Sequence, residues 1–215
     1  MTAVARATET AYITDEEELR AVVGFPIQRV IDKVRPALAN LHRQWISASP
    51  FCVVATSNAD GTVDASPKGD PAGLAHVLDE RTLVIPERPG NKRADGYLNI
   101  LANPHVGLLF VIPGRPDTLR VNGTARLVGD APWFDDLVVK GHRPVLALEV
   151  RVEQVFFHCG KAIVRAQLWQ SETWNPDAVP SRAHVAQQLE RPDESIEELE
   201  RYYGEGYSAR LYSPT

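Results

Sequence analysis

The stretch FCVVATSNADGTVDAS, residues 51–66, decides the fold class of this chain. Residues 51–56 form an apolar run of strand length that begins directly after Pro50. Residues 58–61 combine Asn, Asp and Gly, which are the residues that tight turns favour. Residues 62–66 then return as a partner strand, so the stretch predicts an antiparallel β-hairpin.

Further strands are predicted on the C-terminal side of this hairpin. Residues 75–78 and 82–85 flank a short acidic turn and predict a second hairpin. Longer strands are expected over residues 106–112, 118–128 and 144–157. About six strands joined mainly by short turns favour an antiparallel barrel over a doubly wound parallel sheet. The predicted fold class is therefore mainly β, of the α+β type.

The first fifty residues are predicted to be mostly helical. Thr14 and Glu17 have the spacing of a capping box, and Gly24 is a typical helix end. Apolar residues at helical spacing continue from Ile27, with an interruption at Pro36, to about residue 49. Shorter helices are expected over residues 92–102, 131–140, 161–169 and 193–203, with a loop over residues 172–181.

These elements divide the chain into three parts. Residues 1–49 form an N-terminal helical arm, and residues 50–170 form the barrel. Residues 171–215 form a C-terminal loop and helical tail that packs on the barrel. We therefore expect one β domain surrounded by N-terminal and peripheral helices.

Composition and charge exclude several classes of protein. The net charge is −5, whereas binding to nucleic acid requires a basic surface. No stretch approaches the ~20 apolar residues of a membrane-spanning helix, and residues 1–15 lack the apolar core of a signal peptide. Cys52 and Cys159 lie in apolar runs without a CxxC motif, so no disulfide framework is expected. We expect a cytoplasmic protein without a membrane or nucleic-acid partner.

The segment PERPGNKRADGYLN, residues 86–99, is the strongest candidate for a binding site. A strand ends at Pro86, and Asn91 can cap a helix whose first turn holds Lys92 and Arg93. Cations are unfavourable in a first turn, so a bound anion would explain them. The alternative is a solvated basic turn at a helix start, and the pattern alone favours the two readings about equally.

A second candidate is the segment HCGKAIVRAQLW, residues 158–169. If a helix starts near Gly160, Lys161 and Arg165 share one face and can meet an anion. The alternative is a salt-bridged helix with Trp169 in the core. Metal or thiolate chemistry at His158 and Cys159 is disfavoured because neighbouring strand residues face opposite sides. HExxH, paired CxxC and GxSxG motifs are absent from the chain.

The chain resembles the pyridoxamine 5′-phosphate oxidase-like family of FMN-binding split barrels. The resemblance lies in the segments FCVVATSNADGTVDASPKGDP, RTLVIPERPGNKRADGYLNILANPHVGLLFVIPG and TLRVNGTARLV. It covers roughly residues 25–175, and residues 158–169 resemble an uncharacterised bacterial branch. The resemblance implies a six-stranded split β-barrel and a homodimer with FMN at the subunit interface.

The resemblance also implies roles for individual residues. Lys92 and Arg93 would hold the FMN phosphate, Asn91 would cap the helix beside it, and Asn99 would reach it. The strand that holds Ser66, Pro67 and Lys68 would lie along the flavin ring, and the strand that holds Val84, Ile85 and Pro86 would flank the ribityl chain. Arg120 would face the flavin of the partner subunit. Lys161 and Arg165 would approach the flavin or substrate from the neighbouring subunit, and Trp169 would cover a ring face.

The function that follows is an FMN-dependent oxidoreductase that exchanges a hydride with a small substrate or a reduced nicotinamide. True pyridoxamine-phosphate oxidase activity is not expected, because Arg210 is followed two positions later by Tyr212 instead of the family's His. Two alternatives remain open. One is a non-catalytic dimer that binds FMN or a deazaflavin, and the other is a flavin-free interaction domain.

Overall fold

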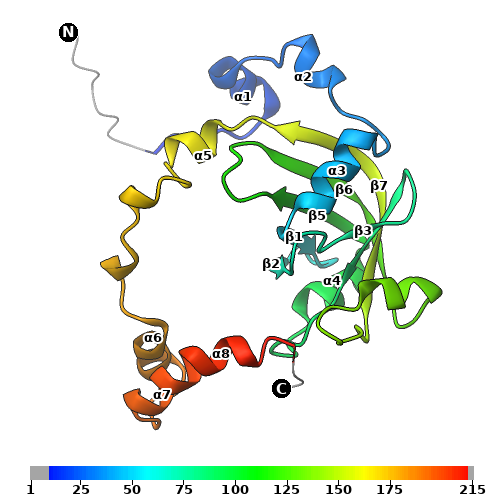
Figure 1. The fold of residues 1–215 in the computed structure, drawn as a ribbon. Coiled ribbons are helices and arrows are strands. Elements are labelled where there is room, and N and C mark those ends of the chain that lie inside the picture. Colours follow the sequence, from blue (N-terminus) through cyan, green and yellow to red (C-terminus); the bar gives the residue numbers. More distant parts are fainter. Residues whose placement is uncertain (1–9, 213–215) are drawn as a thin grey trace. The chain divides into compact units, whose positions relative to one another are not determined.

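The structure is a computed structural model that describes residues 10–212 of the 215-residue chain. The chain divides into two compact units, one ending at Val34 and the other beginning at Arg35, and each is described by itself. Figure 1 shows the helices and strands of both units. Among the described residues, no helix combines the length and the apolar character needed to cross a membrane.

The first unit contains helices α1 (Glu16–Val23) and α2 (Gln28–Asp32), and neither helix buries a residue. Asp15 caps α1, because its side chain accepts a hydrogen bond from the Glu18 N–H at 2.9 Å. The predicted capping box at Thr14 is therefore wrong by one position, although the Thr14 N–H does bond to the Glu18 carboxylate. Gly24 ends α1 as predicted, with a left-handed φ of 74° that suits glycine.

The second unit is built on one antiparallel sheet in the order β2-β1-β5-β6-β7-β4-β3. The prediction of a mainly antiparallel α+β fold is confirmed, but the sheet has seven strands instead of six. Both strands of the predicted second hairpin, β3 and β4, belong to it. The strands are β1 (Phe51–Ser57), β2 (Val63–Gly69), β3 (His76–Val77), β4 (Thr82–Pro86), β5 (His105–Val111), β6 (Thr118–Val128) and β7 (Ala147–His158).

A β-bulge bends the longest strand pair, where the register of β6 against β7 shifts between Asn122 and Gly123. Gly123 is required at this point. A Cβ atom there would lie 1.9 Å from the carbonyl oxygen of Arg151 and 2.9 Å from its carbon, so no side chain fits. A bulge of this kind increases the local twist of the two strands, here β6 and β7.

The second unit also contains several helices, and some of them begin or end at other residues than predicted. The helix predicted over residues 92–102 begins only at Asp95, and residues 131–140 form a shorter 3-10 helix over Pro132–Leu137. The segment at residues 182–189 was not predicted to be helical. The helices of this unit are α3 (Asn40–Ala48), α4 (Asp95–Ala102), α5 (Lys161–Arg165), α6 (Arg182–Leu189), α7 (Ile196–Tyr203) and α8 (Glu205–Ala209), with short 3-10 turns at Ser171–Thr173 and Pro176–Ala178.

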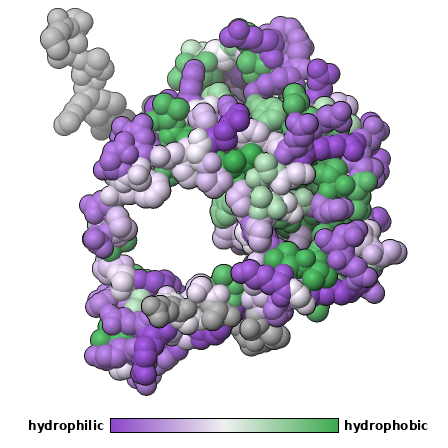
Figure 2. Space-filling model, viewed as in Figure 1, coloured by the Kyte–Doolittle hydropathy of each residue, from purple (hydrophilic) through white to green (hydrophobic). Residues whose placement is uncertain are grey.

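The main hydrophobic core lies between the inner face of the sheet and the helices α3 and α4. Ile46 and Phe110 are fully buried in it, and Trp45 packs edge-on against Phe157 with ring centroids 5.2 Å apart. Other apolar side chains stay outside, such as Leu101, which is 71% exposed. Figure 2 shows apolar patches of this kind within a mainly polar surface.

The C-terminal helices have a small core of their own, formed by Ala183, Ala186 and Leu199 of α6 and α7. The connector that precedes them, residues 170–181, is exposed throughout. Beyond α8 the chain reaches the barrel, where the Tyr212 hydroxyl donates a hydrogen bond of 2.5 Å to Asp70.

Candidate functional site

The edge strand β2 directs alternate side chains to the inner face of the sheet. Lys68 lies opposite Cys52 of β1, and Asp64 lies opposite Thr56. Both β1 partners are buried in the interior. Ser66 lies between Asp64 and Lys68 and has the same orientation, because strand side chains alternate with a period of two. The inner face of β2 therefore presents Asp64, Ser66 and Lys68 in one row.

Helix α4 packs against this row. Asn99 is 7% exposed, and its amide donates a hydrogen bond to the Thr56 hydroxyl at 3.1 Å. In the first turn of α4, a Cβ atom on Gly96 would lie 3.0 Å from a carboxylate oxygen of Asp64. A carboxylate is stabilised beside a helix N-terminus. The start of α4 and the inner row of β2 thus form one polar region.

The basic segment precedes α4 instead of forming its first turn. Ala94 is the N-cap residue, with a left-handed backbone, and Lys92 also has a positive φ, of 60°. Asn91 does not cap the helix as predicted, because its side chain accepts a hydrogen bond from the Arg93 N–H at 3.1 Å. The sequence suggested a regular helix start, but the two left-handed residues prevent helical geometry before Asp95.

Arg93 is held by a carboxylate at the surface. Its Nε lies 2.7 Å from Asp95 Oδ2, and its side chain is 72% exposed. The hydrogen bond and charge of Asp95 raise the pKa of Arg93, and Asp64 adds to this shift. Arg93 therefore lies near both carboxylates at the start of α4.

Three ionisable side chains meet where β2 ends. Lys68 Nζ lies 2.8 Å from the Glu87 carboxylate and 3.1 Å from the Tyr97 hydroxyl, and this hydroxyl donates a hydrogen bond to Glu87. Burial, followed by the hydrogen bond to Glu87, raises the pKa of Tyr97. The Lys68 and Glu87 side chains are only 18% and 27% exposed. We call this group the Lys68 triad.

A second ion pair joins the same two segments of chain. Arg88 Nε lies 2.6 Å from Asp70 Oδ2, and these side chains are 13% and 4% exposed. Arg88 also donates to the Leu137 carbonyl at 2.8 Å. In the sheet, β2 and β4 are not neighbours. The two ion pairs therefore connect the end of β2 with the residues that follow β4, across the split of the barrel.

The predicted residues of β4 are part of the hydrophobic interior. Val84, Ile85 and Pro86 are all buried, and their backbone pairs with β7. Ile85 belongs to the main core, whereas Val84 packs on the opposite side in a smaller cluster with Phe134. The role of this strand beside a ribityl chain stays a prediction.

Pro67 and Arg120 lie on the outer face of the sheet. Pro67 is opposite Val53, which is opposite Leu109, which in turn is opposite Arg120. Arg120 Nε donates to the Asn122 side chain at 3.1 Å and is exposed. Within one chain, Arg120 is therefore separated by the sheet from the inner row that contains Lys68.

Lys161, Arg165 and Trp169 gather at another place, against the loop between β5 and β6. Lys161 and Arg165 both line a surface groove of about 480 Å³ that Pro116 and Asp117 complete. The Trp169 indole donates to the Arg115 carbonyl at 2.8 Å. Trp169 is half-buried and packs on a loop, so it is not a core residue.

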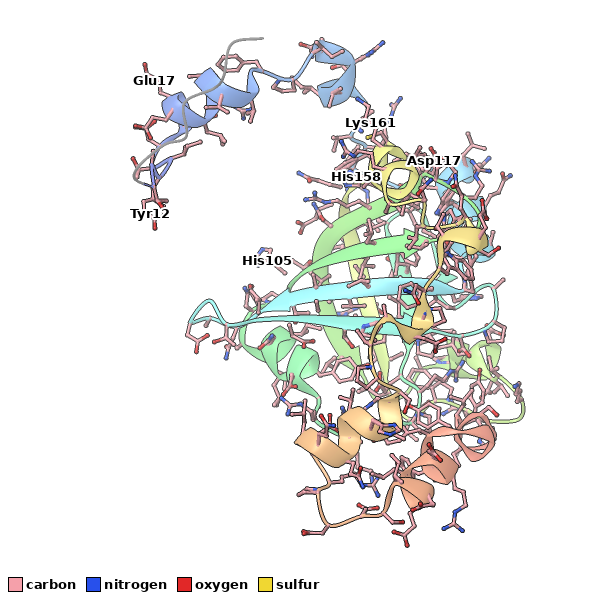
Figure 3. The ribbon with its side chains drawn as sticks, turned by 90° about the vertical axis from the view of Figure 1, so that its left-hand side faces the viewer. Tyr12, Glu17, His105, Asp117, His158 and Lys161 are labelled. Carbon is pink, nitrogen blue, oxygen red and sulfur yellow. The ribbon has the colours of Figure 1, made fainter. Side chains whose placement is uncertain are left out.

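This groove and the start of α4 lie at opposite ends of the sheet. The groove follows His158, which pairs through Thr118 and Val111 with Phe51, whereas α4 bonds to Thr56. From Phe51 to Thr56 the strand rises about 17 Å. Figure 1 shows α4 and α5 at these opposite ends, and Figure 3 shows Asp117, His158 and Lys161 together, away from His105. One chain does not bring the two groups of predicted residues together.

Several residues of this region were missed by the sequence analysis. Asp64, Glu87 and Tyr97 lie within the quoted segments, but they were assigned no role, because their partners lie far away in the sequence and no local pattern reveals such contacts. Tyr212 was noted only as a departure from a motif. Within residues 10–212, no cluster of three His, Cys, Asp or Glu side chains could hold a metal ion.

A single antiparallel sheet with a split that side chains bridge, and with helices on its inner face, defines this protein as a split barrel. The chain belongs to the pyridoxamine 5′-phosphate oxidase family, because residues 38–159, more than half of its length, match that family. A comparison with curated proteins gives no match.

Solved structures similar to this chain include three bacterial proteins of low sequence identity. HupZ of Group A Streptococcus is 22% identical, with a TM-score of 0.45, over 56% of this chain and 93% of its own. A Clostridium acetobutylicum protein related to general stress protein 26 is 16% identical, with a TM-score of 0.42, over 54% and 84%. An FMN-binding protein from Syntrophomonas wolfei is 11% identical, with a TM-score of 0.42, over 54% and 82%.

Proposed function

We propose that this chain is a flavoprotein that binds FMN between the inner row of β2 and the start of α4, and that it acts as an oxidoreductase on a small substrate. Membership of the pyridoxamine 5′-phosphate oxidase family carries this proposal. Bound FMN would supply the centre that accepts and returns a hydride. The substrate partner would be a small molecule or a reduced nicotinamide.

The residues before α4 fit a phosphate group. Lys92 and Arg93 supply two cations, and the first N–H groups of α4 lack partners within the helix. The pair between Arg93 and Asp95 is exposed, and ion pairs of this kind contribute little to stability. Arg93 can therefore exchange Asp95 for a phosphate dianion, which offers more charge and more acceptor oxygens.

Asp64 gives the proposal a sharp test, because its carboxylate lies beside Gly96 at the start of α4. A phosphate bound there would be repelled by this charge. The two substitutions Arg93→Ala and Asp64→Asn should therefore have opposite effects on FMN affinity. A merely structural role of this segment would not produce such opposite effects.

The test begins with the visible absorption spectrum of the purified protein, before and after FMN is added and the sample is desalted. We expect about one flavin per subunit. Quenching of FMN fluorescence should then show that Arg93→Ala weakens binding by about tenfold or more, and that Asp64→Asn strengthens it. Arg182→Ala removes an exposed cation of α6 and serves as the control, with unchanged affinity. Persistent absence of flavin, or an unchanged dissociation constant for Arg93→Ala, would contradict the proposed site.

The Lys68 triad would act on the substrate side of the flavin site. Its three groups neutralise and orient one another, so Lys68 would present a fixed ammonium instead of a mobile one. Tyr97 keeps its proton because burial and Glu87 raise its pKa. Tyr97 and Lys68 would therefore serve as hydrogen-bond donors that position a bound molecule.

A non-catalytic carrier of FMN or of a deazaflavin is the second candidate. The mutual pairing of Lys68, Glu87 and Tyr97 favours it, since these groups bond to one another instead of projecting as a free acid or base. Steady-state turnover with a reduced nicotinamide and an electron acceptor separates the two candidates. Turnover that requires bound FMN supports the oxidoreductase, whereas tight flavin binding without turnover supports the carrier.

We also propose that two copies of the chain pair around the flavin. The outer face of the sheet carries half-buried or exposed apolar side chains on β1 and β5, among them Phe51, Val53 and Leu109. Pairing two such faces about a two-fold axis would bury them. Arg120 lies on the same outer face, so this pairing would place it in the interface between the two subunits.

A further inference from the structure

A surface groove between α5 and the β5–β6 loop has the features of a second binding site. Pro116 and Asp117 form one side of the groove, and Gly160, Lys161, Val164 and Arg165 form the other, around a volume of about 480 Å³. These residues lie at the end of the sheet opposite to the start of α4, as the labelled Asp117 and Lys161 show in Figure 3. The groove is thus distinct, within one chain, from the proposed flavin site.

The groove is held in shape by contacts at both of its ends. Gly160 packs so closely on Pro116 that a Cβ atom would lie 2.6 Å from the proline ring. At the other end, the Trp169 indole donates to the Arg115 carbonyl at 2.8 Å. The Arg115 guanidinium in turn lies 5.0 Å from the Trp45 ring. A ligand would therefore meet a wall that is already formed, which lowers the entropy cost of binding.

The charges in the groove are unbalanced. Lys161 and Arg165 lie one helical turn apart on the same face, where like charges repel each other. Neither side chain forms a hydrogen bond or ion pair with another residue of the described part of the chain. The carboxylate of the groove, Asp117, is engaged by Arg115 at 3.1 Å.

Several other exposed arginines in the structure have a carboxylate partner. Arg93, Arg126 and Arg143 each pair with a carboxylate at 2.7 Å or less. Lys161 and Arg165 have no such carboxylate partner among the described residues. A bound anion would remove their repulsion and supply the missing partner.

The groove also has an apolar component. Val164 is 62% exposed, and Pro116 lies across from it. We propose that the groove binds a phosphate monoester with an apolar or aromatic body, the phosphate between Lys161 and Arg165 and the body along Val164 and Pro116. A phosphate monoester carries a charge of about −1.5 to −2 at neutral pH, which matches two cations. This site does not depend on the proposed binding of FMN.

Titration calorimetry of the full chain with phenyl phosphate tests this site. The double variant Lys161→Gln/Arg165→Gln should weaken binding by about tenfold or more, and Asp117→Asn should strengthen it. Arg126→Gln removes an exposed cation of β6 that pairs with Glu149, and it should leave the affinity unchanged. Circular dichroism melting shows whether each variant is folded.

Two further ligands separate the parts of the site. Inorganic phosphate should bind more weakly than phenyl phosphate, and benzoate should bind more weakly because its charge is smaller. Val164→Ser should weaken the binding of phenyl phosphate and leave the binding of inorganic phosphate unchanged. Equal affinity of the double variant and the original chain for phenyl phosphate, or no binding to the original chain at millimolar concentration, would overturn the proposal.

The FMN content of the same samples keeps the two sites apart. If the double variant loses phenyl phosphate but retains FMN, the groove is a separate site. If it loses FMN as well, the cations belong to a flavin site shared between subunits, and the groove is not the separate site that we propose. Failure of FMN binding in the original chain would leave the phenyl phosphate result unaffected.

Discussion

His42 of α3 shows how the surroundings of one residue set its chemistry. It is 7% exposed, its Nδ1 accepts a hydrogen bond from the Ala39 N–H at 3.1 Å, and its ring lies 5.4 Å from that of Phe157. Burial, and then the positive charge of Arg35, lower the pKa of His42 below its usual 6.5. The neutral imidazole is therefore the form that the fold accepts.

This shift predicts a pH dependence of stability. Because the folded pKa of His42 is below the unfolded value of 6.5, the unfolded chain binds the proton more readily. Stability from His42 is fully present above pH 6.5 and is lost as the pH falls through the lowered folded pKa. His42→Asn keeps an acceptor but cannot titrate, so its free energy of unfolding in urea should fall less between about pH 7.5 and about pH 5.5. The exposed His105 gives the control variant His105→Asn, and an unchanged pH dependence in His42→Asn would refute the assignment.

Single-residue roles were the least predictable part of the site from the sequence. The basic pair Lys92 and Arg93 was found because its composition is local. The prediction that Asn91 caps the helix is wrong because the backbone at Lys92 and Ala94 is left-handed. The sequence pattern does not reveal this conformation. The approach of Asp64 to the start of α4 depends on tertiary packing, so no window of sequence contains it.

At the scale of elements, the two ion pairs across the split hold together segments that the sheet does not join. The pair between Lys68 and Glu87 is partly buried, so removal of one partner leaves the other charge poorly solvated. Glu87→Gln should lower the free energy of unfolding by about 1–3 kcal/mol in urea denaturation. Glu190→Gln breaks an ion pair of similar length with Arg182, in which both side chains are about half exposed, and its stability should hardly change. Equal effects of the two substitutions would show that the Lys68 triad does not stabilise the split.

Strands were easier to predict than helices in this chain. The β1–β2 hairpin and the positions of β5, β6 and β7 follow from apolar runs and turn residues. Helix α6 was missed because its buried residues, Ala183 and Ala186, are small and give no apolar stripe in the sequence. The late start of α4 has a different origin, the left-handed backbone at Lys92 and Ala94, which composition does not encode.

At the scale of the molecule, the outer face of the sheet carries apolar side chains that stay partly exposed in a single chain. Val53 and Leu109 lie side by side on neighbouring strands, half-buried, and Phe51 beside them is 38% exposed. Apolar side chains grouped in this way are typical of a surface that another protein covers. A second copy of the chain would cover this face and would place Arg120 of each copy in the proposed interface.

The proposed dimer predicts that a charge on this face separates the subunits and lowers the FMN content. Sedimentation velocity of the original chain should give twice the subunit mass of 23.8 kDa. Leu109→Lys places an ammonium in the apolar row, and its burial against a second copy costs more than the contact gains. We expect a monomer with reduced FMN content and an unchanged far-ultraviolet circular dichroism spectrum. Leu189→Lys adds the same charge to α6, at a residue that is 77% exposed, and should remain dimeric with full flavin content. A folded Leu109→Lys monomer that binds FMN as tightly as the original chain would show that each subunit holds the flavin alone, and that Arg120 of the partner has no part in the site.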